Sequence, residues 1–274
     1  MSIQVLACLQ ILLGDYLMIF IVGGKGLTGS AFVKNLEKKQ IEFKIIQKEN
    51  KEEFFGKDCD VLIFANGNSI KYKANVDPLF DFHASVSSVA EYVHNINCNL
   101  FVLLSSIEVY DQHSSLETSK EDTKINEQNL EPYGYHKFLV EKYVKRFVKN
   151  FLIFRLPAIV GIGTRKNPIY DFLHNHKKVM ISQNSQLNVI NTRIIADIVL
   201  EIIGKNIHNE IFNLASTNSI RLGDIKNIVN FDSDYTKESE EHLQKYHINT
   251  DKIQKYVKLS TSEEAIIEYN ESLK

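Results

Sequence analysis

Residues 20–30 read FIVGGKGLTGS, a short apolar run that enters a turn containing four glycines. Three of them, Gly23, Gly26 and Gly29, fit the pattern GxxGxxG, and Gly24 begins an overlapping GxGxxG. The apolar run is typical of a buried parallel strand, and the residues after the turn follow the pattern of an amphipathic helix. Backbone amides at such a helix N-terminus face a pyrophosphate with the positive end of the helix dipole. The stretch therefore predicts a dinucleotide-binding turn.

The strand and helix pattern repeats through the first half of the chain. Runs typical of buried strands occupy 42–47, 60–66, 99–106 and, including the exit of the strand, 150–161. Helical patterns occupy 77–96 and 133–149. Strands that alternate with helices indicate the α/β class with a parallel sheet. We therefore predict a Rossmann-type, doubly wound parallel sheet.

Beyond this half we expect a second, smaller lobe. An NAD(P)-binding Rossmann domain is predicted over 17–160, and 187–215 returns to it because strand–helix–strand character reappears there. A smaller substrate-binding lobe is predicted over 161–274, and its charged tail from Arg221 favours helix in LGDIKNIVN and TSEEAIIEYNESLK. Residues 1–16 form an apolar extension, which we interpret as an overlong start or a loosely packed segment.

Charge and hydropathy exclude two classes of partner. The 274 residues carry 32 Lys and Arg against 34 Asp and Glu, a formal charge of −2, so no basic surface for nucleic acid is implied. No apolar run is long enough to span a bilayer. We expect a cytoplasmic protein that does not bind membranes.

The cysteines and histidines show no pattern of a metal centre. Cys8, Cys59 and Cys98 are scattered without a CxxC pair, which argues against a disulfide framework or a thiolate zinc site and suits a reducing compartment. His174 and His176 are the one close histidine pair, and no carboxylate or cysteine cluster completes a site around them. We predict no metal.

The end of the second predicted strand lacks the acid that usually binds the adenosine ribose. The sequence there is IIQKEN, which places Gln47 and then Lys48 at the strand tip. Lysines attract a 2′-phosphate, and Lys25 in the glycine turn would add a second cation. We expect NADP in preference to NAD. The alternative is that both lysines are simply solvated.

A serine, a tyrosine and a lysine lie downstream at spacings that suit proton transfer. Tyr133 and Lys137 in EPYGYHK are four residues apart and share a helix face, and LLSSIEVY ends a strand with Ser105 and Ser106. The Lys137 ammonium and a cationic nicotinamide ring would together bring the pKa of Tyr133 down towards working pH, so that the tyrosine exchanges a proton with an alcohol or ketone. Ser106 would hydrogen-bond the same oxygen. Tyr135 is better interpreted as packing.

Together these motifs resemble the extended short-chain dehydrogenase/reductase family, which contains NAD-dependent epimerases and dehydratases of nucleotide sugars. The resemblance covers about residues 17–220 through VGGKGLTGS, DVLIFAN, LLSSIEVY, YGYHK, FRLPAIVGIG and EIFNLAS. It implies a nucleotide-sugar substrate, and a homodimer formed through two helices of the cofactor domain, one of them 133–149. The oligomeric state itself stays open.

The resemblance implies roles for individual residues. It assigns Ser106, Tyr133 and Lys137 to catalysis. It also places Ala65 and Asn66 beside the riboses, and Pro157 in the nicotinamide pocket. With the glycine turn and the second strand tip, the residues expected at the cofactor are Gly23, Lys25, Gly26, Leu27, Gly29, Gln47, Lys48, Ala65, Asn66, Tyr133, Lys137 and Pro157.

Departures from the family pattern narrow the expected reaction. In the 4,6-dehydratases of the family that the chain resembles, an aspartate occupies the position of Ile107, and Glu108 is kept. Without that aspartate, a dehydration reaction is disfavoured. Ala158 stands where many members have an asparagine that touches the substrate. We expect a 4-keto-sugar reductase in which Tyr133 is the general acid. The alternatives are a nucleotide-sugar 4-epimerase and, in another class, a non-catalytic NAD(P)-binding regulator.

Overall fold

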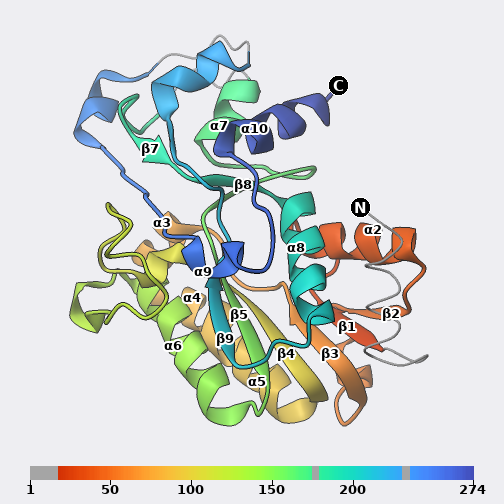
Figure 1. The fold of residues 1–274 in the computed structure, drawn as a ribbon. Coiled ribbons are helices and arrows are strands. Elements are labelled where there is room, and N and C mark those ends of the chain that lie inside the picture. Colours follow the sequence, from red (N-terminus) through yellow and green to blue (C-terminus); the bar gives the residue numbers. More distant parts are fainter. Residues whose placement is uncertain (1–17, 175–178, 230–234) are drawn as a thin grey trace. The chain divides into compact units, whose positions relative to one another are not determined.

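The computed structural model describes residues 18–174, 179–229 and 235–274 (Figure 1). These residues form two compact units. The first runs to Asp111 and adds Lys124–Arg155 and Ala196–Phe212, and the second comprises Gln112–Thr123, Leu156–Ile195 and Asn213–Lys274. The first unit thus takes back a shorter return segment than the 187–215 expected from sequence. The assignment of functional domains stays a prediction.

Three sequence expectations fall on residues outside the described ranges. These are the extension at 1–16, Cys8, and His176 of the histidine pair. Within the described ranges, no helix combines the length and the apolar character needed to cross a bilayer.

The first unit is built around a six-stranded sheet. Its strands and helices are β1 (Ile19–Val22), α2 (Gly29–Lys39), β2 (Phe43–Ile46), β3 (Asp58–Phe64), α3 (Lys71–Val76), α4 (Pro78–Phe82), α5 (Ser88–Asn95), β4 (Asn97–Ser106), α6 (Pro132–Phe147), β5 (Phe151–Leu156), α8 (Thr192–Gly204) and β9 (Glu210–Asn213). The strand order is β2-β1-β3-β4-β5-β9. β1 pairs in parallel with both β2 and β3, and β3 pairs in parallel with β4. The predicted Rossmann-type parallel sheet is therefore confirmed.

The chain order along the sheet reverses at β1. From β1 the chain moves to β2 on one side and then crosses to β3 on the other. Ligands of open α/β sheets bind outside the carboxyl ends of the strands at such a switch point. A ligand site is therefore expected at the residues that follow β1 and β3.

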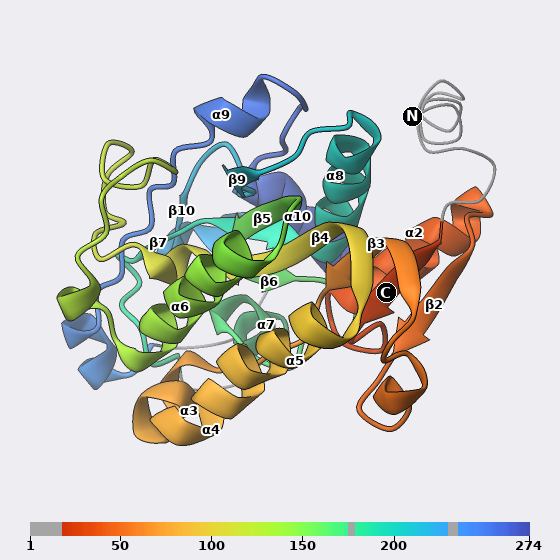
Figure 2. The same ribbon diagram turned by 90° about the horizontal axis from the view of Figure 1, so that it is seen from below.

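Helices cover both faces of this sheet (Figures 1 and 2). Successive side chains of β1 point to opposite faces of the sheet. Phe20 and Val22, on one face, belong to a buried cluster with residues of α5 and α6. On the other face, Asn35 of α2 is hydrogen-bonded to Asp197 of α8. Each fully buried aromatic side chain contributes about 1.5–3 kcal/mol of hydrophobic stabilisation.

Two predicted elements differ in detail from the structure. The helix expected over 77–96 is interrupted between α4 and α5 by a π-helical turn, His83–Ser87. The strand expected over 150–161 is two strands, because β5 lies in the central sheet while β6 (Ala158–Val160) pairs with another strand. Pro157 separates them, and a proline has no N–H to continue a strand ladder.

The second unit has its own small sheets and core. β6 pairs in parallel with β8 (Val189–Asn191), and β7 (Gln186–Leu187) pairs antiparallel with β10 (Ile220–Arg221). Its helices are α7 (Pro168–Leu173), α9 (Asp251–Gln254) and α10 (Ser262–Glu271). The core cluster includes Phe172, Val189 and Tyr269. A capping box between Thr261 and Glu264 starts α10, the helix that the tail sequence predicts.

Candidate active site

The glycine turn after β1 is compact, and its shape depends on two glycines. Gly23 adopts a left-handed φ of +78°, and its carbonyl oxygen accepts a hydrogen bond of 2.8 Å from Gly26 N. A Cβ atom at Gly29 would lie 2.1 Å from that same oxygen. Thr28, which precedes α2, does not cap the helix with its side chain. The turn thus brings the start of α2 close to the end of β1, as a pyrophosphate-binding turn requires.

The turn lies against the end of β3, at the switch point. A Cβ atom at Gly23 would lie 3.1 Å from both the carbonyl oxygen of Ala65 and the Cβ of Asn66. Ala65 N donates a 3.0 Å hydrogen bond to Val22 O, which extends the strand pairing to the edge of the site. The structure therefore brings the glycine turn together with Ala65 and Asn66. Leu27 is half-buried within the turn.

Gln47, at the tip of β2, is tied to the glycine turn. With its carboxamide oxygen towards the turn, it accepts hydrogen bonds from Gly24 N at 3.0 Å and Lys25 N at 3.1 Å. Next to these contacts, Gly23 N donates a 2.9 Å hydrogen bond to Ile46 O, which also links the glycine turn to β2. The side chains of Lys25 and Lys48 are exposed. The sequence predicts Gln47 at the cofactor, but the hydrogen bonds from Gln47 to the glycine turn are visible only in the structure.

Ser106, Tyr133 and Lys137 converge at the carboxyl end of β4. Pro132 occupies the first turn of α6, which carries Tyr133 and Lys137, and Ser106 ends β4. The Tyr133 hydroxyl is hydrogen-bonded to the Ser106 side chain. Lys137 Nζ lies 5.5 Å from the centroid of the Tyr133 ring. All three side chains are nearly buried, with exposed fractions of 8–9%.

The adjacent Ser105 has a different role. Its hydroxyl donates a 2.6 Å hydrogen bond to Glu141, and Glu141 forms a buried ion pair with Arg155 at 2.7 Å. This network ties α6 to β4 and β5 beneath the site. Only Ser106 of the two serines therefore faces Tyr133. Sequence analysis missed Glu141 and Arg155, whose pairing depends on a fold that brings two separate elements together.

Gly134 explains how α6 approaches the strand end so closely. A Cβ atom at this position would lie 2.2 Å from the Glu108 carbonyl oxygen. Tyr133 N donates a 3.3 Å hydrogen bond to Asn75 Oδ1, which steadies the first turn of the helix. Tyr135 is 37% exposed, and its interpretation as a packing residue stays a prediction.

Burial controls the protonation of Tyr133 and Lys137. Desolvation raises the pKa of Tyr133, the negative charge of Glu108 raises it further, and the hydrogen bond with Ser106 opposes the shift. Desolvation also lowers the pKa of Lys137, while the charge of Asp81 opposes that shift. In the protein alone, desolvation and Glu108 thus raise the pKa of Tyr133, and the lowering expected from Lys137 together with a cationic nicotinamide ring stays a prediction. The tyrosine is held as a phenol, ready to donate a proton.

The residues after Ser106 offer no free acid pair. Ile107 is 3% exposed and packs into the core. Glu108 forms an ion pair of 2.8 Å with Lys71 of α3, and Lys71 also lies 3.5 Å from Glu131. The carboxylate next to the site is thus held by a cation that sequence analysis did not identify.

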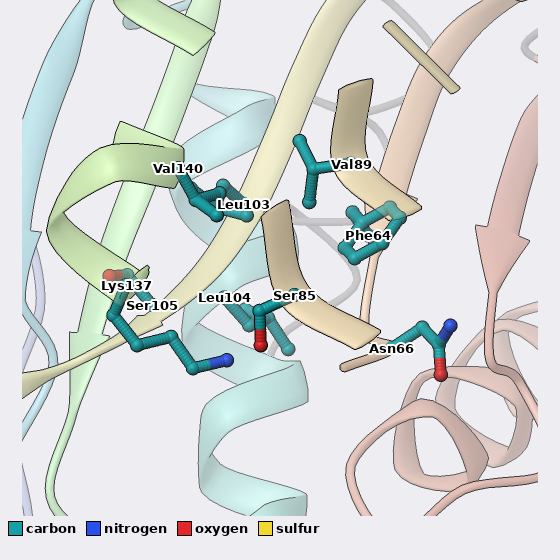
Figure 3. Close-up of a pocket in the computed structure, with 9 residues that line it drawn as sticks. All are labelled: Phe64, Asn66, Ser85, Val89, Leu103, Leu104, Ser105, Lys137 and Val140. Carbon is teal, nitrogen blue, oxygen red and sulfur yellow. The ribbon is translucent and has the colours of Figure 1, made fainter. Parts of the chain in front are cut away.

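A small pocket lies beside Lys137 (Figure 3). The Lys137 amino group points toward Ser85, and Asn66 lies at the same rim. Gly67, with φ +119°, lies near the Lys137 amino group, since a Cβ atom there would lie 3.4 Å from Lys137 Nζ. The nine lining residues are Phe64, Asn66, Ser85, Val89, Leu103, Leu104, Ser105, Lys137 and Val140. The pocket thus lies between the end of β3 and α6.

Two further predictions concern residues away from this cluster. In the part of the chain that the structure describes, no group of three or more His, Cys, Asp or Glu side chains could hold a metal ion. Pro157 belongs to the second unit, where it is buried between β5 and β6. Its predicted place at the cofactor stays a prediction.

Comparison with known proteins identifies one sequence profile and many similar folds. The profile of the NAD dependent epimerase/dehydratase family matches residues 19–215. No curated protein sequence matches the chain. One similar solved structure is UDP-N-acetylglucosamine 4-epimerase from Methanobrevibacter ruminantium M1 in complex with UDP-N-acetylmuramic acid, with a TM-score of 0.76 and 15% identity over 93% of this chain and 97% of that one.

Two further solved structures are similar in fold. A dTDP-4-dehydrorhamnose reductase from Clostridium acetobutylicum gives a TM-score of 0.74 at 18% identity, covering 94% of this chain and 99% of that one. RMD from Pseudomonas aeruginosa, complexed with NADPH, gives 0.77 at 14% identity, covering 94% and 100%. These low identities establish the fold and do not distinguish one reaction from another.

Proposed function

The chain belongs to the NAD dependent epimerase/dehydratase family of enzymes, and from this premise we propose that it is an NAD(P)-dependent reductase of a 4-keto nucleotide sugar. The observation that carries the proposal is the convergence of Ser106, Tyr133 and Lys137 at one strand end. Solved structures of this fold include enzymes named for UDP- and dTDP-sugars, which supports a nucleotide sugar as the substrate.

The proposed reaction reduces the ketone at carbon 4 of the sugar to an alcohol. A bound nicotinamide supplies the hydride. Tyr133 donates its phenol proton to the ketone oxygen, and the raised pKa of the buried phenol keeps that proton available. Ser106 donates a hydrogen bond to the same oxygen, and Lys137 stabilises the phenolate that remains.

The surroundings of Ser106 argue against dehydration. That reaction requires an acid to handle the leaving hydroxyl, and Ile107 offers an aliphatic side chain that is buried in the core. Glu108, the remaining acid, is ion-paired with Lys71. A reaction that needs only proton donation at the ketone fits these residues better.

The glycine turn fits the pyrophosphate of a dinucleotide, because its two tight glycines leave room for close backbone approach. We propose NADP as the preferred cofactor. Lys25 N donates to Gln47 and Lys48 follows Gln47, so two exposed lysines lie near the second strand tip, where Gln47 replaces the usual acid. Lys137 would also hold the nicotinamide ribose.

The assembly and location of the enzyme are proposals of the same kind. We propose a homodimer that uses α6 and the neighbouring α4, where Leu79, Phe82 and Phe147 are exposed apolar side chains. A cytoplasmic location is supported by Cys59 and Cys98, which lie opposite each other in the β3–β4 register and are not disulfide-bonded.

The test is turnover of NADPH with a 4-keto-6-deoxy nucleotide sugar made by a 4,6-dehydratase. We expect substrate-dependent loss of NADPH, and a fall in kcat of about 100- to 10,000-fold in Tyr133→Phe. Nucleotide binding should be unchanged in this variant, because only the phenol oxygen is removed. Tyr135→Phe is the matched control and should retain kcat.

Other outcomes would select a different function. A tightly bound NAD that does not exchange, with interconversion of UDP-sugars and no net NADPH consumption, would identify a 4-epimerase. Binding of nucleotide with no turnover on any 4-keto sugar or UDP-sugar would favour a non-catalytic regulator. Unchanged kcat in Tyr133→Phe would refute Tyr133 as the proton donor.

A further inference from the structure

A buried carboxylate lies behind the catalytic helix, on an element that the proposed reaction does not use. Asp81 belongs to α4 and is completely buried. It is far in sequence from α6, yet its Oδ2 lies 2.7 Å from His136 Nδ1. His136 directly precedes Lys137 and is 7% exposed. Burying a carboxylate costs free energy of folding unless the group is paired and hydrogen-bonded.

Both oxygens of Asp81 have polar partners, and Oδ2 lies against His136. Oδ1 accepts from Asn68 Nδ2 at 2.8 Å and from the Ser85 hydroxyl at 3.3 Å. Asn68 in turn accepts from Ile70 N at 2.8 Å, so the loop after β3 is held in place as well. Three polar side chains thus surround the Asp81 carboxyl group, as a buried acid requires.

The backbone around Asp81 is arranged to bring these donors together. The helix widens into the π-helical turn His83–Ser87, which carries Ser85. Such turns are rare and occur frequently at functional sites. Ser85 also lines the pocket into which Lys137 points (Figure 3). The π-helical turn thus connects the buried carboxylate with the pocket of the catalytic lysine.

The charge of Asp81 acts on both members of the catalytic pair. It raises the pKa of Lys137, against the larger effect of desolvation. It also raises the pKa of Tyr133, where desolvation and Glu108 act in the same direction. Because Asp81 raises both pKa values, Lys137 keeps its charged ammonium and Tyr133 keeps its neutral phenol to a higher pH than they would without Asp81.

We propose that the Asp81 carboxylate, anchored by His136, is a positioning residue that keeps Lys137 protonated beside the catalytic tyrosine. Asp81 touches neither substrate nor cofactor in this account and acts through Lys137. The inference rests on the proposed function for its catalytic meaning, while the effect on Lys137 is a property of the protein alone.

Other titratable groups face the same region. Tyr133 and Lys137 extend from α6, Glu108 lies on the 3₁₀ turn after β4, and Lys71 pairs with it from α3. His83 of the π-helical turn is exposed and lies 3.4 Å from the Ser87 hydroxyl. His136 is itself titratable, and a charged imidazole would weaken the effect of Asp81, so its substitution belongs in the test.

The direct test is a pH titration of Lys137 in protein without substrate. The protein is labelled with 13C at lysine Cε, and the Lys137 signal is identified by its loss in Lys137→Met. We expect Lys137 to be charged at neutral pH in the parent. In Asp81→Asn, which keeps the side-chain shape, its titration should move about one pH unit lower or more.

Two variants separate charge from packing. Asp77→Asn removes an exposed carboxylate that caps the same helix, and Lys137 should titrate as in the parent. His136→Asn keeps a donor toward Asp81, so the titration of Lys137 should not fall. The inference is overturned if Asp81→Asn leaves the titration unchanged, or if His136→Asn lowers it equally. If Asp81→Asn does not fold, an uncharged Lys137 at neutral pH in the parent is sufficient to overturn it, and a charged one supports it.

Kinetics supply the functional readout. The alkaline limb of the kcat/KM profile for ketone reduction should lie at lower pH in Asp81→Asn, because both catalytic protons are then lost earlier. An alkaline limb at the parental pH would contradict the catalytic role of Asp81. Absence of reductase turnover in the parent would refute the proposed function and leave the Lys137 titration as an independent test.

Discussion

At the scale of single residues, neighbouring serines with identical chemistry have opposite environments. Ser106 ends β4 and is hydrogen-bonded to the Tyr133 hydroxyl. Ser105, one residue earlier, points to the other side of the strand and donates to Glu141. The alternation of side chains along a strand therefore decides which serine is available for chemistry.

This difference gives a matched pair of variants. Ser106→Ala should lower kcat by about 100-fold or more, because a hydrogen bond to the reacting oxygen is lost. Ser105→Ala should retain kcat within a few-fold. It should lower the free energy of unfolding by about 1–3 kcal/mol, since Glu141 loses a buried donor. Steady-state kinetics and urea unfolding measure the two effects. A Ser105→Ala variant that loses turnover while staying stable would reverse our assignment.

At the scale of elements, the strand–turn–helix unit depends on close backbone approach. The start of α2 lies so near the end of β1 that Gly29 has no space for a side chain. The same principle recurs at Gly134, where α6 meets the 3₁₀ turn after β4. Glycine at these two positions lets α2 approach the end of β1 and lets α6 approach the turn after β4.

We predict that Gly29→Ala weakens nucleotide binding by at least about tenfold. The added methyl group would overlap Gly23 O, so the turn must shift, at a cost of about 1–3 kcal/mol. Fluorescence titration with NADPH measures the affinity, and thermal unfolding measures the stability. Gly56→Ala is the control, since Gly56 also has a positive φ of +80° but no atom lies within 4 Å of the added Cβ. It should destabilise the fold and leave the affinity intact.

Equal affinities of the parent and Gly29→Ala for NADPH would show that this turn does not hold the pyrophosphate. A loss of affinity in Gly56→Ala as large as in Gly29→Ala would attribute the effect to general destabilisation.

At the scale of the whole molecule, nucleotide binding should appear as a shift of global stability. A ligand that binds only the folded protein stabilises it by about 2.7 kcal/mol when present at 100 times its Kd. The chain is nearly neutral, with a formal charge of −2, so a preference for the extra phosphate of NADP must come from local cations. Lys25 and Lys48 are the exposed candidates at the second strand tip.

We therefore predict a larger rise of Tm with NADPH than with NADH at equal concentrations. Lys25→Ala should reduce the rise with NADPH and leave the rise with NADH unchanged. Lys34→Ala removes an exposed cation from α2 and serves as the control for net charge. If both nucleotides raise Tm equally in the parent and in Lys25→Ala, the preference for NADP and the role of Lys25 are both refuted.

Much of the first unit could be predicted because its signals are local. The apolar strand residues, the glycine turn and the helix that carries Tyr133 and Lys137 are each contained in a short stretch of sequence. The breaks in regular structure were harder to predict. The π-helical turn at His83–Ser87 has no distinct composition, and the effect of Pro157 on its strand became clear only once the partner of β6 was known.

The sequence by itself determined the class of fold, the cofactor turn and the order of serine, tyrosine and lysine, because strand and helix periods and glycine spacing are written in consecutive residues. Only the tertiary structure decided which serine meets Tyr133, how burial raises the pKa of that tyrosine, and that Asp81 meets His136 across 55 positions of sequence. Such effects depend on desolvation and on charges brought together from separate elements, and neither quantity exists until the chain has folded.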